Sequence, residues 1–416
     1  MVDPQPDPVT PPQPHDSMRG AGQLTVSHGV APLAVMADRA GAVLVGQACG
    51  DALGVPYEFV APKLEGRPVM KGGGIGGYEP AEWSDETQLS ICLAEVGARG
   101  TDFTLESTLD EIATRYIAGL RTGVSELDAQ TRVVFDSVLY DEVPGRPAQK
   151  MRRAAAYFHR RTSRSAANGA LGRGAIIGLT RVLDPDWTAE SARAVAELTH
   201  VDPLAGDSCV LLAEAIRASV TDPQVGDHAW RRRIHLEAGL ELLPPQRRTD
   251  WMDWLGQAAE QYFKPPIDNS FTVAAFQAVV GAIVTAANDP ACDDPTRAFT
   301  IAVEEAVRVG GDTDAIAGVT GALMGAAVGL DAIPQTWRDR IHGWPGLDVD
   351  GLQDLAIATA LAGVVGEAKM SAIIERGIDL RALIEERARA EHAAAAEMAG
   401  EAGGDTLQGQ APTLDV

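Results

Sequence analysis

Two groups of polar and acidic residues stand where helices are expected to begin, far apart along the chain. Ser84, Asp85 and Glu86 precede an amphipathic stretch, and Asp312 and Asp314 precede sixteen residues without a charge. An unpaired carboxylate buried beside such a helix costs several kcal/mol, so a cation is its natural partner. Oxygen ligands of this kind suit Mg²⁺ or Mn²⁺ rather than zinc. The two groups therefore predict a site for divalent cations.

Helix capping is the alternative explanation for each group. Aspartate and serine are common at helix starts, where they accept hydrogen bonds from free N–H groups and complement the helix dipole. Ser84 is a suitable N-cap for a helix whose apolar stripe includes Leu89 and Val96. Either group alone favours capping, whereas the recurrence of such residues at two distant helix starts favours a metal site.

Glycines recur on the two helices that are expected to position these groups. One helix spans residues 315–330 and the other spans residues 38–54, and their glycines fall three or four apart: Gly318, Gly321, Gly325 and Gly329 in the first, and Gly46, Gly50 and Gly54 in the second. This spacing places glycines on one helical face and lets another backbone approach closely. Apolar residues fill the other faces, so both helices are expected to be buried all round, with Asp51 as a lone buried carboxylate.

The remaining pattern predicts one large all-α domain with a central buried bundle. Residues 271–287 and 355–365 are further uncharged helices, and no segment shows convincing strand alternation. We expect the folded domain to cover residues 34–370, followed by a solvated helix over residues 371–398. The Pro-rich residues 1–33 and the terminal residues 399–416 have little to pack and are predicted to be disordered.

The composition indicates which classes of partner and which cellular compartment to expect. The net charge of −23 argues against a nucleic acid or an anionic membrane as the main partner. The uncharged helix after Asp314 is shorter than the roughly 20 residues of a membrane span. The amino terminus lacks the basic start and apolar core of a signal peptide, and the four separated cysteines are expected to be reduced core residues. A cytoplasmic protein is therefore predicted.

Three loop segments carry possible binding functions. Residues 72–77 satisfy the letters GxGxxG, but no strand precedes them and Pro80 follows, so a loop that approaches a ligand is predicted rather than a Rossmann turn. Residues 165–178 form a small-residue turn that leads into a buried helix. His200 and Asp202 are either functional or a structural hydrogen-bonded pair. The charged, Trp-rich residues 222–262 are predicted to be surface helices.

With these segments in view, the chain resembles the ADP-ribosylglycohydrolase family over residues 40–366, with five motifs in the family's order. WSDETQLS is similar to the family's first metal motif, Thr-Asp-Asp-Thr, and GGDTDAIAG is similar to its second. The resemblance implies two divalent cations, Mg or Mn, as cofactors. The metal ligands that it implies are Ser84, Asp85, Glu86, Asp312 and Asp314.

The other three motifs are those that meet the substrate in the family. GQACGDALGVPYEF resembles a motif that ends in a functional glutamate, which implies a catalytic role for Glu58. SAANGALGR resembles the Asn-Gly turn that holds ADP-ribose, which implies substrate binding by Ser165, Asn168 and Gly169. THVDP resembles the histidine segment beside the substrate and implicates His200.

Four positions depart from the family's pattern. Ser84 replaces a threonine and Glu86 replaces the second aspartate of the first metal motif. Ala315 stands where the last threonine of the second motif would supply an oxygen, and Gly172 replaces the methionine usual after the Asn-Gly turn. These departures bear on the occupancy of the second metal, on the level of activity and on the substrate.

The resemblance implies an all-α domain of orthogonal helices and a hydrolase that removes ADP-ribose from a modified side chain. An arginine linkage is favoured, because GDALG, EF and the Trp83 before the first metal motif look closer to the bacterial arginine-type enzymes. The expected partner is an ADP-ribosylated protein or a small ADP-ribosyl conjugate. The alternative is a catalytically silent relative that binds ADP-ribose or is structural, which Ala315 favours, whereas the retained Glu58, Asp85, Asp312 and Asp314 favour an enzyme.

Overall fold

The computed structural model describes residues 29–401 except 61–63, 65, 142, 163, 227–228, 261–262, 265 and 267. Most of the two tails predicted to be disordered, residues 1–28 and 402–416, therefore lies outside the described residues. Between these limits the chain is helical, and the described residues form isolated β-bridges but no sheet. The predicted all-α fold is confirmed, and a Rossmann arrangement around residues 72–77 is excluded.

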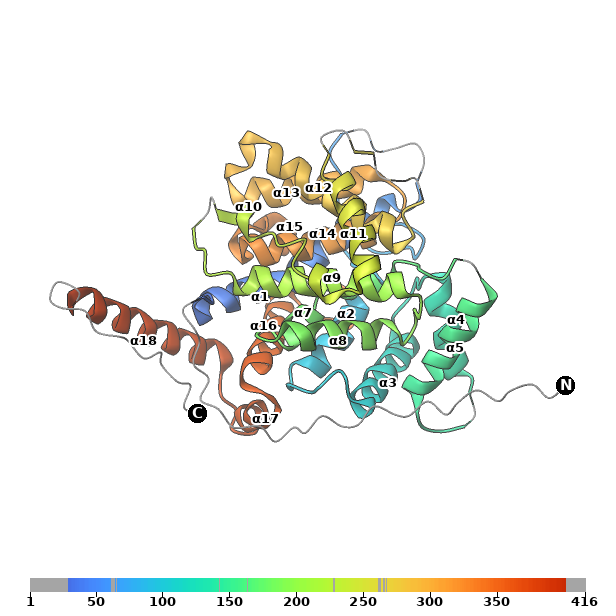
Figure 1. Cartoon of the computed structure of the whole chain (residues 1–416), viewed down its shortest axis with the longest axis horizontal. Helices are drawn as coiled ribbons and strands as arrows, with labels where there is room; N and C mark the ends of the chain where they lie inside the picture. Colours follow the sequence, from blue (N-terminus) through green and yellow to red (C-terminus); the bar gives the residue numbers. More distant parts are fainter. Residues whose placement is uncertain are drawn as a thin grey trace.

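Eighteen α-helices make up the described part of the chain, and Figure 1 shows their arrangement. They are α1 (Leu33–Gly54), α2 (Asp85–Gly97), α3 (Glu106–Thr122), α4 (Ala129–Leu139), α5 (Pro147–Arg161), α6 (Gly169–Gly172), α7 (Ile177–Thr180), α8 (Pro185–Ala196), α9 (Pro203–Thr221), α10 (Trp230–Arg233), α11 (Pro245–Ala258), α12 (Thr272–Asn288), α13 (Pro295–Val309), α14 (Thr313–Val328), α15 (Gln335–Arg338), α16 (Val349–Val365), α17 (Glu367–Glu375) and α18 (Leu380–Glu401).

Helices α1 and α14 form the centre of the fold because their glycines let the two backbones touch. A Cβ added at Gly50 would lie 2.0 Å from the carbonyl oxygen of Ala317, and one added at Gly321 would lie 2.1 Å from that of Gly46. No side chain fits at such distances, so the predicted glycine faces are confirmed as contact surfaces. Gly329 is different, because it ends α14 in the left-handed region at φ +86°.

The antiparallel packing of this pair brings the end of α1 to the start of α14. Thr313 donates its hydroxyl hydrogen to the carbonyl oxygen of Gly54 at 2.8 Å. One turn further along, the backbone N–H of Phe59 donates to the carbonyl oxygen of Gly311 at 2.7 Å. The residues that follow α1 therefore meet those that precede α14, although more than 250 positions separate them.

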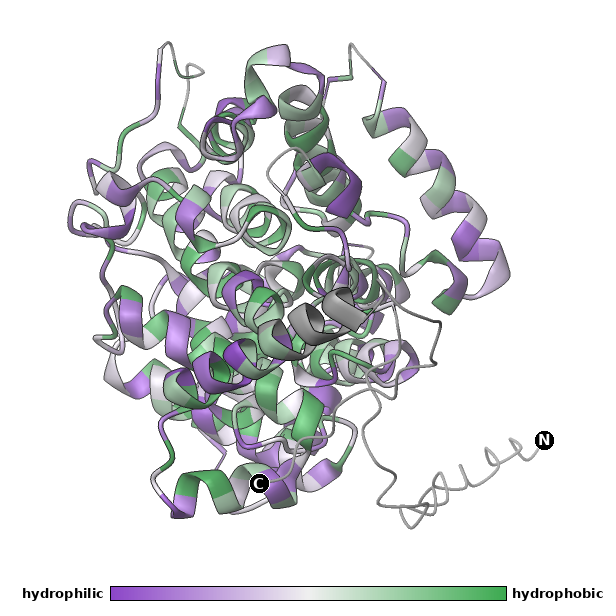
Figure 2. Ribbon diagram, turned by 90° about the vertical axis from the view of Figure 1, so that its left-hand side faces the viewer, coloured by the Kyte–Doolittle hydropathy of each residue, from purple (hydrophilic) through white to green (hydrophobic). Residues whose placement is uncertain are grey.

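The other helices surround this pair. Helices α12 and α13 pack against α14, and α16 packs against α1. In Figure 1, α12 and α13 lie at the top of the molecule, α3, α4 and α5 lie on its right-hand side, and α18 projects from the left. Helices at the edge alternate polar and apolar colours in Figure 2, as expected of helices with one face in solvent.

Segment 222–262 is more deeply packed than its charge indicates. The prediction of surface helices is wrong for part of this segment, because Trp230 and Trp251 are fully buried. The Trp251 ring contacts Phe276 of α12 edge-on, with ring centroids 5.9 Å apart. Large aromatic rings bury enough apolar area to anchor a helix that is otherwise polar. All four cysteines are buried and free, as predicted.

The described helices include none long and apolar enough to cross a membrane. At the carboxyl end, Ile384 of α18 packs against Ala37 of α1 and Ile357 of α16. This contact ties the beginning of α18 to the main body of helices.

Candidate functional site

A cavity of about 370 Å³ opens where α1 ends and α14 begins. Its lining residues are Glu58, Phe59, Ile75, Asp85, Glu86, Glu126, Leu127, Asp128, Ala129, Gln130, Phe158, Arg164, Ala167, Asn168, Ser270, Asp312 and Asp314. Six of the ten predicted site residues are among them, from four separate segments of the chain. The volume and the convergent polar groups are those of a small-molecule site. Ile75 shows that the glycine loop at 72–77 also reaches this cavity.

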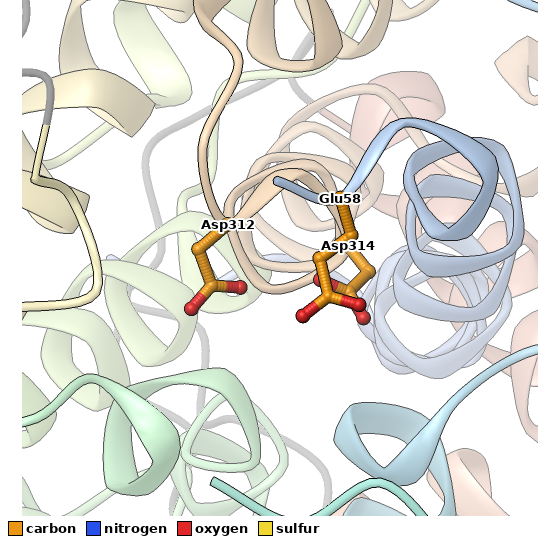
Figure 3. Close-up of side chains that lie close together, drawn as sticks. All are labelled: Glu58, Asp312 and Asp314. Carbon is orange, nitrogen blue, oxygen red and sulfur yellow. The ribbon is translucent and has the colours of Figure 1, made fainter. Parts of the chain in front are cut away.

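Three carboxylates gather at one end of the cavity. Glu58, Asp312 and Asp314 each offer an oxygen within 4.8 Å of the other two. Figure 3 shows the three side chains from the adjoining ends of α1 and α14, with their oxygens facing the same open space. The prediction had separated Glu58, as a catalytic residue, from the metal ligands, whereas the structure places all three in one cluster.

Burial, followed by crowding of negative charge, raises the pKa values of the carboxylates in and beside this cluster. Burial, followed by the charges of Asp314 and Asp312, raises the pKa of Glu58 to about 9. Burial also raises the pKa of Asp314, and burial together with the Asp314 charge raises the pKa of Asp312 well above its ordinary value. Burial, ahead of repulsion from neighbouring carboxylates, raises the pKa values of Asp85 and Glu86 as well. Each shift favours a proton or a metal ion over a bare carboxylate.

The donor set of the cavity fits hard divalent cations. Seven carboxylates line it, and Arg164 is the one basic side chain among the described lining residues. Arg164 is itself paired with Asp268, outside the lining. Ligands that are oxygen only, and that carry this much negative charge, match the preferences of Mg²⁺ and Mn²⁺.

The start of α2 is capped from another helix. Asp51 of α1 accepts hydrogen bonds from the backbone N–H and the hydroxyl of Ser84, at 2.9 and 2.8 Å. It also accepts from the backbone N–H and the hydroxyl of Thr87, at 3.0 and 2.6 Å. Ser84 occupies the N-cap position of α2, but the alternative of side-chain capping does not hold for it, since its hydroxyl donates to Asp51 and makes no capping bond. Burial, followed by the charge of Asp314, raises the pKa of Asp51 to about 7.

This cap leaves the two acidic residues of the first turn available to the cavity. Asp85 and Glu86 are buried and line the cavity, and neither side-chain carboxylate accepts a hydrogen bond from another described residue. Capping accounts only in part for the other pair, because Asp312 makes no side-chain cap, whereas Asp314 accepts a bond from the Ala315 N–H at 3.0 Å. The capping alternative therefore does not explain why these carboxylates converge.

The extra methylene of Glu86 occupies space that Gly172 leaves empty. A Cβ added at Gly172 would lie 1.6 Å from a carboxylate oxygen of Glu86. Gln47 holds the two segments together, since its amide donates to the carbonyl oxygens of Glu86 and Gly172 at 3.0 and 2.8 Å. Residues 86 and 172, where the resemblance implies departures from the family's pattern, are thus adjacent in space, and the Glu86 carboxylate fills the volume beside Gly172.

A double-mutant cycle tests whether Glu86 and Gly172 interact. Gly172→Ala is expected to displace the Glu86 carboxylate and to weaken Mn²⁺ binding by about 10-fold or more, a loss typical of disturbed metal-site geometry. Glu86→Asp in the same chain is expected to restore most of the affinity, because the shorter side chain makes room for the methyl group. Calorimetric Mn²⁺ titration of both single variants and the double variant measures this. Additive losses would show that the two residues do not interact.

An asparagine that the sequence analysis missed holds the turn before α14. Asn269, 1% exposed, donates its side-chain N–H to the carbonyl oxygen of Gly310 at 2.7 Å and accepts from the backbone N–H of Asp312 at 2.9 Å. A Cβ added at Gly311, whose φ is +78°, would lie 2.1 Å from the side-chain amide oxygen of Asn269. Asn269 therefore fixes the backbone position of Asp312. Because Asn269 lies 43 residues before Asp312, no motif around Asp312 indicates this contact.

Asn168 connects the predicted substrate turn to the acidic cluster. Its side-chain N–H₂ donates to Asp312 at 3.0 Å and to the carbonyl oxygen of Asn269 at 3.2 Å. The backbone N–H of Asn168 donates to the carbonyl oxygen of Ser270 at 2.9 Å. The predicted Asn-Gly turn thus borders the cavity through Asn168, directly beside Asp312.

The other predicted substrate residues lie behind this wall and do not line the cavity. Ser165 bonds to His159 at 2.6 Å and donates to Asp202 at 3.1 Å. Gly169 approaches Asp128 so closely that an added Cβ would lie 2.2 Å from its carboxylate. These residues therefore support the lining rather than form it in this structure.

His200 is fully buried next to the cavity wall. Its Nδ1 bonds to the Thr199 hydroxyl at 2.8 Å, and its Nε2 lies 4.0 Å from the carboxylate of Asp128, a lining residue. Burial lowers the pKa of His200 to about 4, so the ring is neutral near pH 7. The alternative of a His200–Asp202 pair is not what the described residues show, since Asp202 bonds to Ser165 and to the Leu204 N–H.

Comparison with known proteins gives one family across most of the chain. The sequence model of the ADP-ribosylglycohydrolase family matches residues 32–369. A solved structure named "ADP-ribosylglycohydrolase-related protein complex" is similar with a TM-score of 0.58 and 27% identity, covering 79% of this chain and 99% of that one.

Named relatives are similar at 24 to 26% identity. The ADP-ribosylarginine hydrolase Tri1 of Serratia proteamaculans is 24% identical over 310 residues, which is 73% of this chain and 75% of the relative. The ADP-ribosyl-[dinitrogen reductase] glycohydrolase of Rhodospirillum rubrum is 24% identical over 311 residues, 73% of this chain and 90% of the relative. Human ADP-ribosylhydrolase ARH3 is 26% identical over 178 residues, 38% of this chain and 49% of the relative.

Proposed function

Because this chain belongs to the ADP-ribosylglycohydrolase family, we propose that it hydrolyses the bond between ADP-ribose and a modified side chain. The observation that carries the proposal is the convergence of Glu58, Asp312 and Asp314, with oxygens within 4.8 Å of one another, at one end of a cavity that Asp85 and Glu86 also line. A merely structural relative has no use for five buried or half-buried carboxylates that form no ion pair with a lysine or arginine among the described residues.

Two divalent cations, Mg²⁺ or Mn²⁺, are proposed to bind these carboxylates. Asp312 and Asp314 would hold them from the start of α14, and Asp85 and Glu86 from the start of α2. Ser84 is proposed as a further ligand, because a hydroxyl that donates its hydrogen to Asp51 keeps its acceptor lone pairs. When bound, such ions hold sugar hydroxyls and lower the pKa of a water molecule.

The protein's own residues would orient the sugar and handle the proton. The transition state of glycoside hydrolysis resembles an oxocarbenium ion, so negative side chains beside C1 of the ribose stabilise it. Glu58 is proposed to position the attacking water or to take its proton. Asn168, with Ser165, Gly169 and His200 behind it, is proposed to hold the ADP-ribose.

An arginine linkage is the favoured substrate class. Tri1 and the dinitrogen reductase glycohydrolase are both similar to this chain over about three quarters of its length, and the name of Tri1 specifies ADP-ribosylarginine. A cavity with seven carboxylates and one arginine also suits a cationic guanidinium as the departing group. The proposed partner is an ADP-ribosylated protein or a small ADP-ribosyl conjugate.

A catalytically silent protein that binds ADP-ribose is the second candidate, and Ala315 is the residue that favours it. The two are separated by offering ADP-ribosylated arginine and ADP-ribosylated serine in Mg²⁺, Mn²⁺ or EDTA, while calorimetry follows the binding of free ADP-ribose. Release from the arginine conjugate with metal confirms the proposal, and release from serine alone corrects the linkage. Binding of ADP-ribose without release from either conjugate would establish the silent relative.

Ala315 provides a prediction about the weaker ion. It is buried in the first turn of α14, directly after Asp314, and offers a methyl group where the family's pattern has a hydroxyl. Mg²⁺ readily keeps water ligands, so the missing oxygen is expected to weaken one ion without abolishing the site. Ala315→Thr is expected to move the metal dependence of hydrolysis to lower concentration. Titrations of Mg²⁺ and Mn²⁺ measure this, and unchanged midpoints would mean that residue 315 does not face the ions.

A further inference from the structure

One helix at the surface carries a concentration of positive charge that contrasts with the rest of the chain. Residues 145–165, which include α5, contain seven of the 35 lysines and arginines and no aspartate or glutamate. The chain as a whole carries a net charge of −23. The family resemblance does not account for this segment, because none of its motifs falls within α5.

The basic residues of α5 lie opposite its buried side. Ala148, Met151 and Ala155 are fully buried, which turns one face of the helix toward its neighbours α3 and α4. Arg153 and Arg160 follow the 3.6-residue period on the opposite face and are exposed. We call Arg153, Tyr157, Arg160 and Arg161 the basic face of α5.

The arginines of this face have no acidic partner among the described residues. Lys150 pairs with Asp141 and Arg152 with Glu106, so the flanks of the helix are neutralised. No ion pair involves Arg153, Arg160 or Arg161 within the described chain, and Arg161 instead stacks over the ring of Tyr157 at 5.2 Å. Tyr157 is itself 55% exposed. Aromatic and arginine side chains together are enriched at protein interfaces.

The carboxyl end of α5 reaches the cavity. Phe158, near the end of α5, and Arg164, just beyond it, both line the cavity. Figure 1 places α5 at the outside of the molecule, next to α4. A molecule that lies along α5 therefore extends to the place where the proposed substrate enters.

We propose that the basic face of α5 docks an acidic segment of the ADP-ribosylated protein while the modified side chain occupies the cavity. This proposal rests on the proposed function and specifies that the substrate protein carries an acidic segment next to its modified residue. The net charge of the chain is negative, so an acidic segment is repelled by the molecule as a whole and attracted by the basic face of α5, and this charge pattern steers the partner toward the cavity. A protein is favoured over a nucleic acid because the helix is short, about 22 Å for fifteen residues, and because the net charge of −23 repels a long phosphate backbone.

The test compares substrates that differ only in the charge next to the modified residue. Two ADP-ribosylarginine peptides of equal length, one with Asp and Glu flanks and one with Ser and Gln flanks, are assayed beside free ADP-ribosylarginine. The triple variant Arg153→Glu, Arg160→Glu and Arg161→Glu is expected to lose about 10-fold or more in kcat/KM on the acidic peptide, as expected for lost electrostatic steering. Its activity on the neutral peptide and on the free conjugate is expected to stay within about twofold of wild type.

A matched control reverses three exposed arginines elsewhere. Arg297 of α13, Arg376 directly after α17 and Arg389 of α18 are exposed and without an ion pair among the described residues. Their change to glutamate alters the net charge equally and is expected to leave the preference for the acidic peptide intact. Raising the salt from about 50 to about 200 mM is expected to reduce that preference in wild type.

Several outcomes would overturn the proposal. Equal losses in the two triple variants would mean that only net charge matters, and an unchanged preference in the α5 variant would mean that the basic face does not dock the partner. Fluorescence anisotropy with the unmodified acidic peptide and with an oligonucleotide of equal charge decides between partners, and binding of the oligonucleotide alone would overturn the inference. Failure of wild type on every conjugate would refute the proposed function, whereas the anisotropy comparison would still test the basic face.

Discussion

Replacing Asp314 with asparagine is expected to abolish metal-dependent hydrolysis. Asp314 is buried, contributes an oxygen to the cluster with Glu58 and Asp312, and raises the pKa values of several of its neighbours. Asparagine keeps the shape of the side chain but removes the charge that would hold the cation. Because a Lewis-acid ion contributes several kcal/mol to a transition state, the rate is expected to fall about 1,000-fold or more. Asp312→Asn is expected to behave in the same way.

The stability of the metal-free variant separates this role from capping. Removal of one charge from a crowded, buried cluster relieves repulsion, so Asp314→Asn is expected to melt no earlier than wild type in EDTA. The rise in Tm that Mn²⁺ gives wild type is expected to disappear. A capping residue would show the opposite pattern, with a lower Tm in EDTA and normal turnover. Asp331→Asn, an exposed carboxylate beyond the other end of α14, serves as the control.

Glu58→Gln is expected to lower turnover by about 100-fold or more, which is the usual contribution of general acid–base catalysis. Glutamine preserves the volume and hydrogen-bonding capacity of residue 58 but accepts no proton at neutral pH. The affinity for free ADP-ribose, measured by calorimetry, is expected to stay within a few-fold of wild type. Glu79→Gln, at an exposed glutamate in the same segment, is expected to change neither quantity.

The position of Glu58 inside the acidic cluster gives this variant a second measurement. If Glu58 serves the water, Mn²⁺ affinity is expected to change little while the rate falls. A parallel loss of Mn²⁺ affinity and rate would assign Glu58 to metal binding instead, and a parallel loss of ADP-ribose affinity would assign it to substrate binding. Turnover, Mn²⁺ affinity and ADP-ribose affinity together therefore distinguish catalysis, metal binding and substrate binding as the role of Glu58.

The central geometry of the protein could be predicted from sequence because it depends on local patterns. Gly46, Gly50 and Gly321 have a spacing that leaves one helical face bare, and a bare face is useful only where another backbone touches it. Asp312 and Asp314 directly precede an uncharged helix, so their location at the mouth of a buried element followed from their neighbours. The all-α class and the proximity of acidic residues that are distant in sequence could both be predicted from such local patterns.

Other features could not be predicted, because they depend on which segments meet. Ser84 is a good N-cap by type, yet Asp51 reaches the same helix end from α1 and takes its hydroxyl hydrogen. Asn269 has no local motif, and its function arises only where residues 310–312 pass beside it. Trp251 lies in a charged segment whose partner, α12, could not be identified from the segment itself. Tertiary contacts decided each of these positions.

The arrangement of charge explains why the site is built on rigid elements. Carboxylates that repel one another remain together only if the backbone that carries them cannot move apart, and the direct contact of α1 with α14 supplies that constraint. Asn168 donates a hydrogen bond to the Asp312 carboxylate, and Asn269 accepts one from the Asp312 backbone N–H, which fixes that residue further. A bound cation relieves the repulsion that remains among these carboxylates, and this relief favours cation binding.

The most direct test of the account is the release of ADP-ribose from an ADP-ribosylarginine peptide by protein stripped with EDTA and then titrated with Mn²⁺. We expect no release from the stripped protein, recovery as Mn²⁺ is added, and no recovery in the Asp314→Asn variant at the same concentrations. Undiminished release in EDTA, or no release at any Mn²⁺ concentration while free ADP-ribose still binds, would contradict the assignment of this acidic cavity as a metal-dependent hydrolase site.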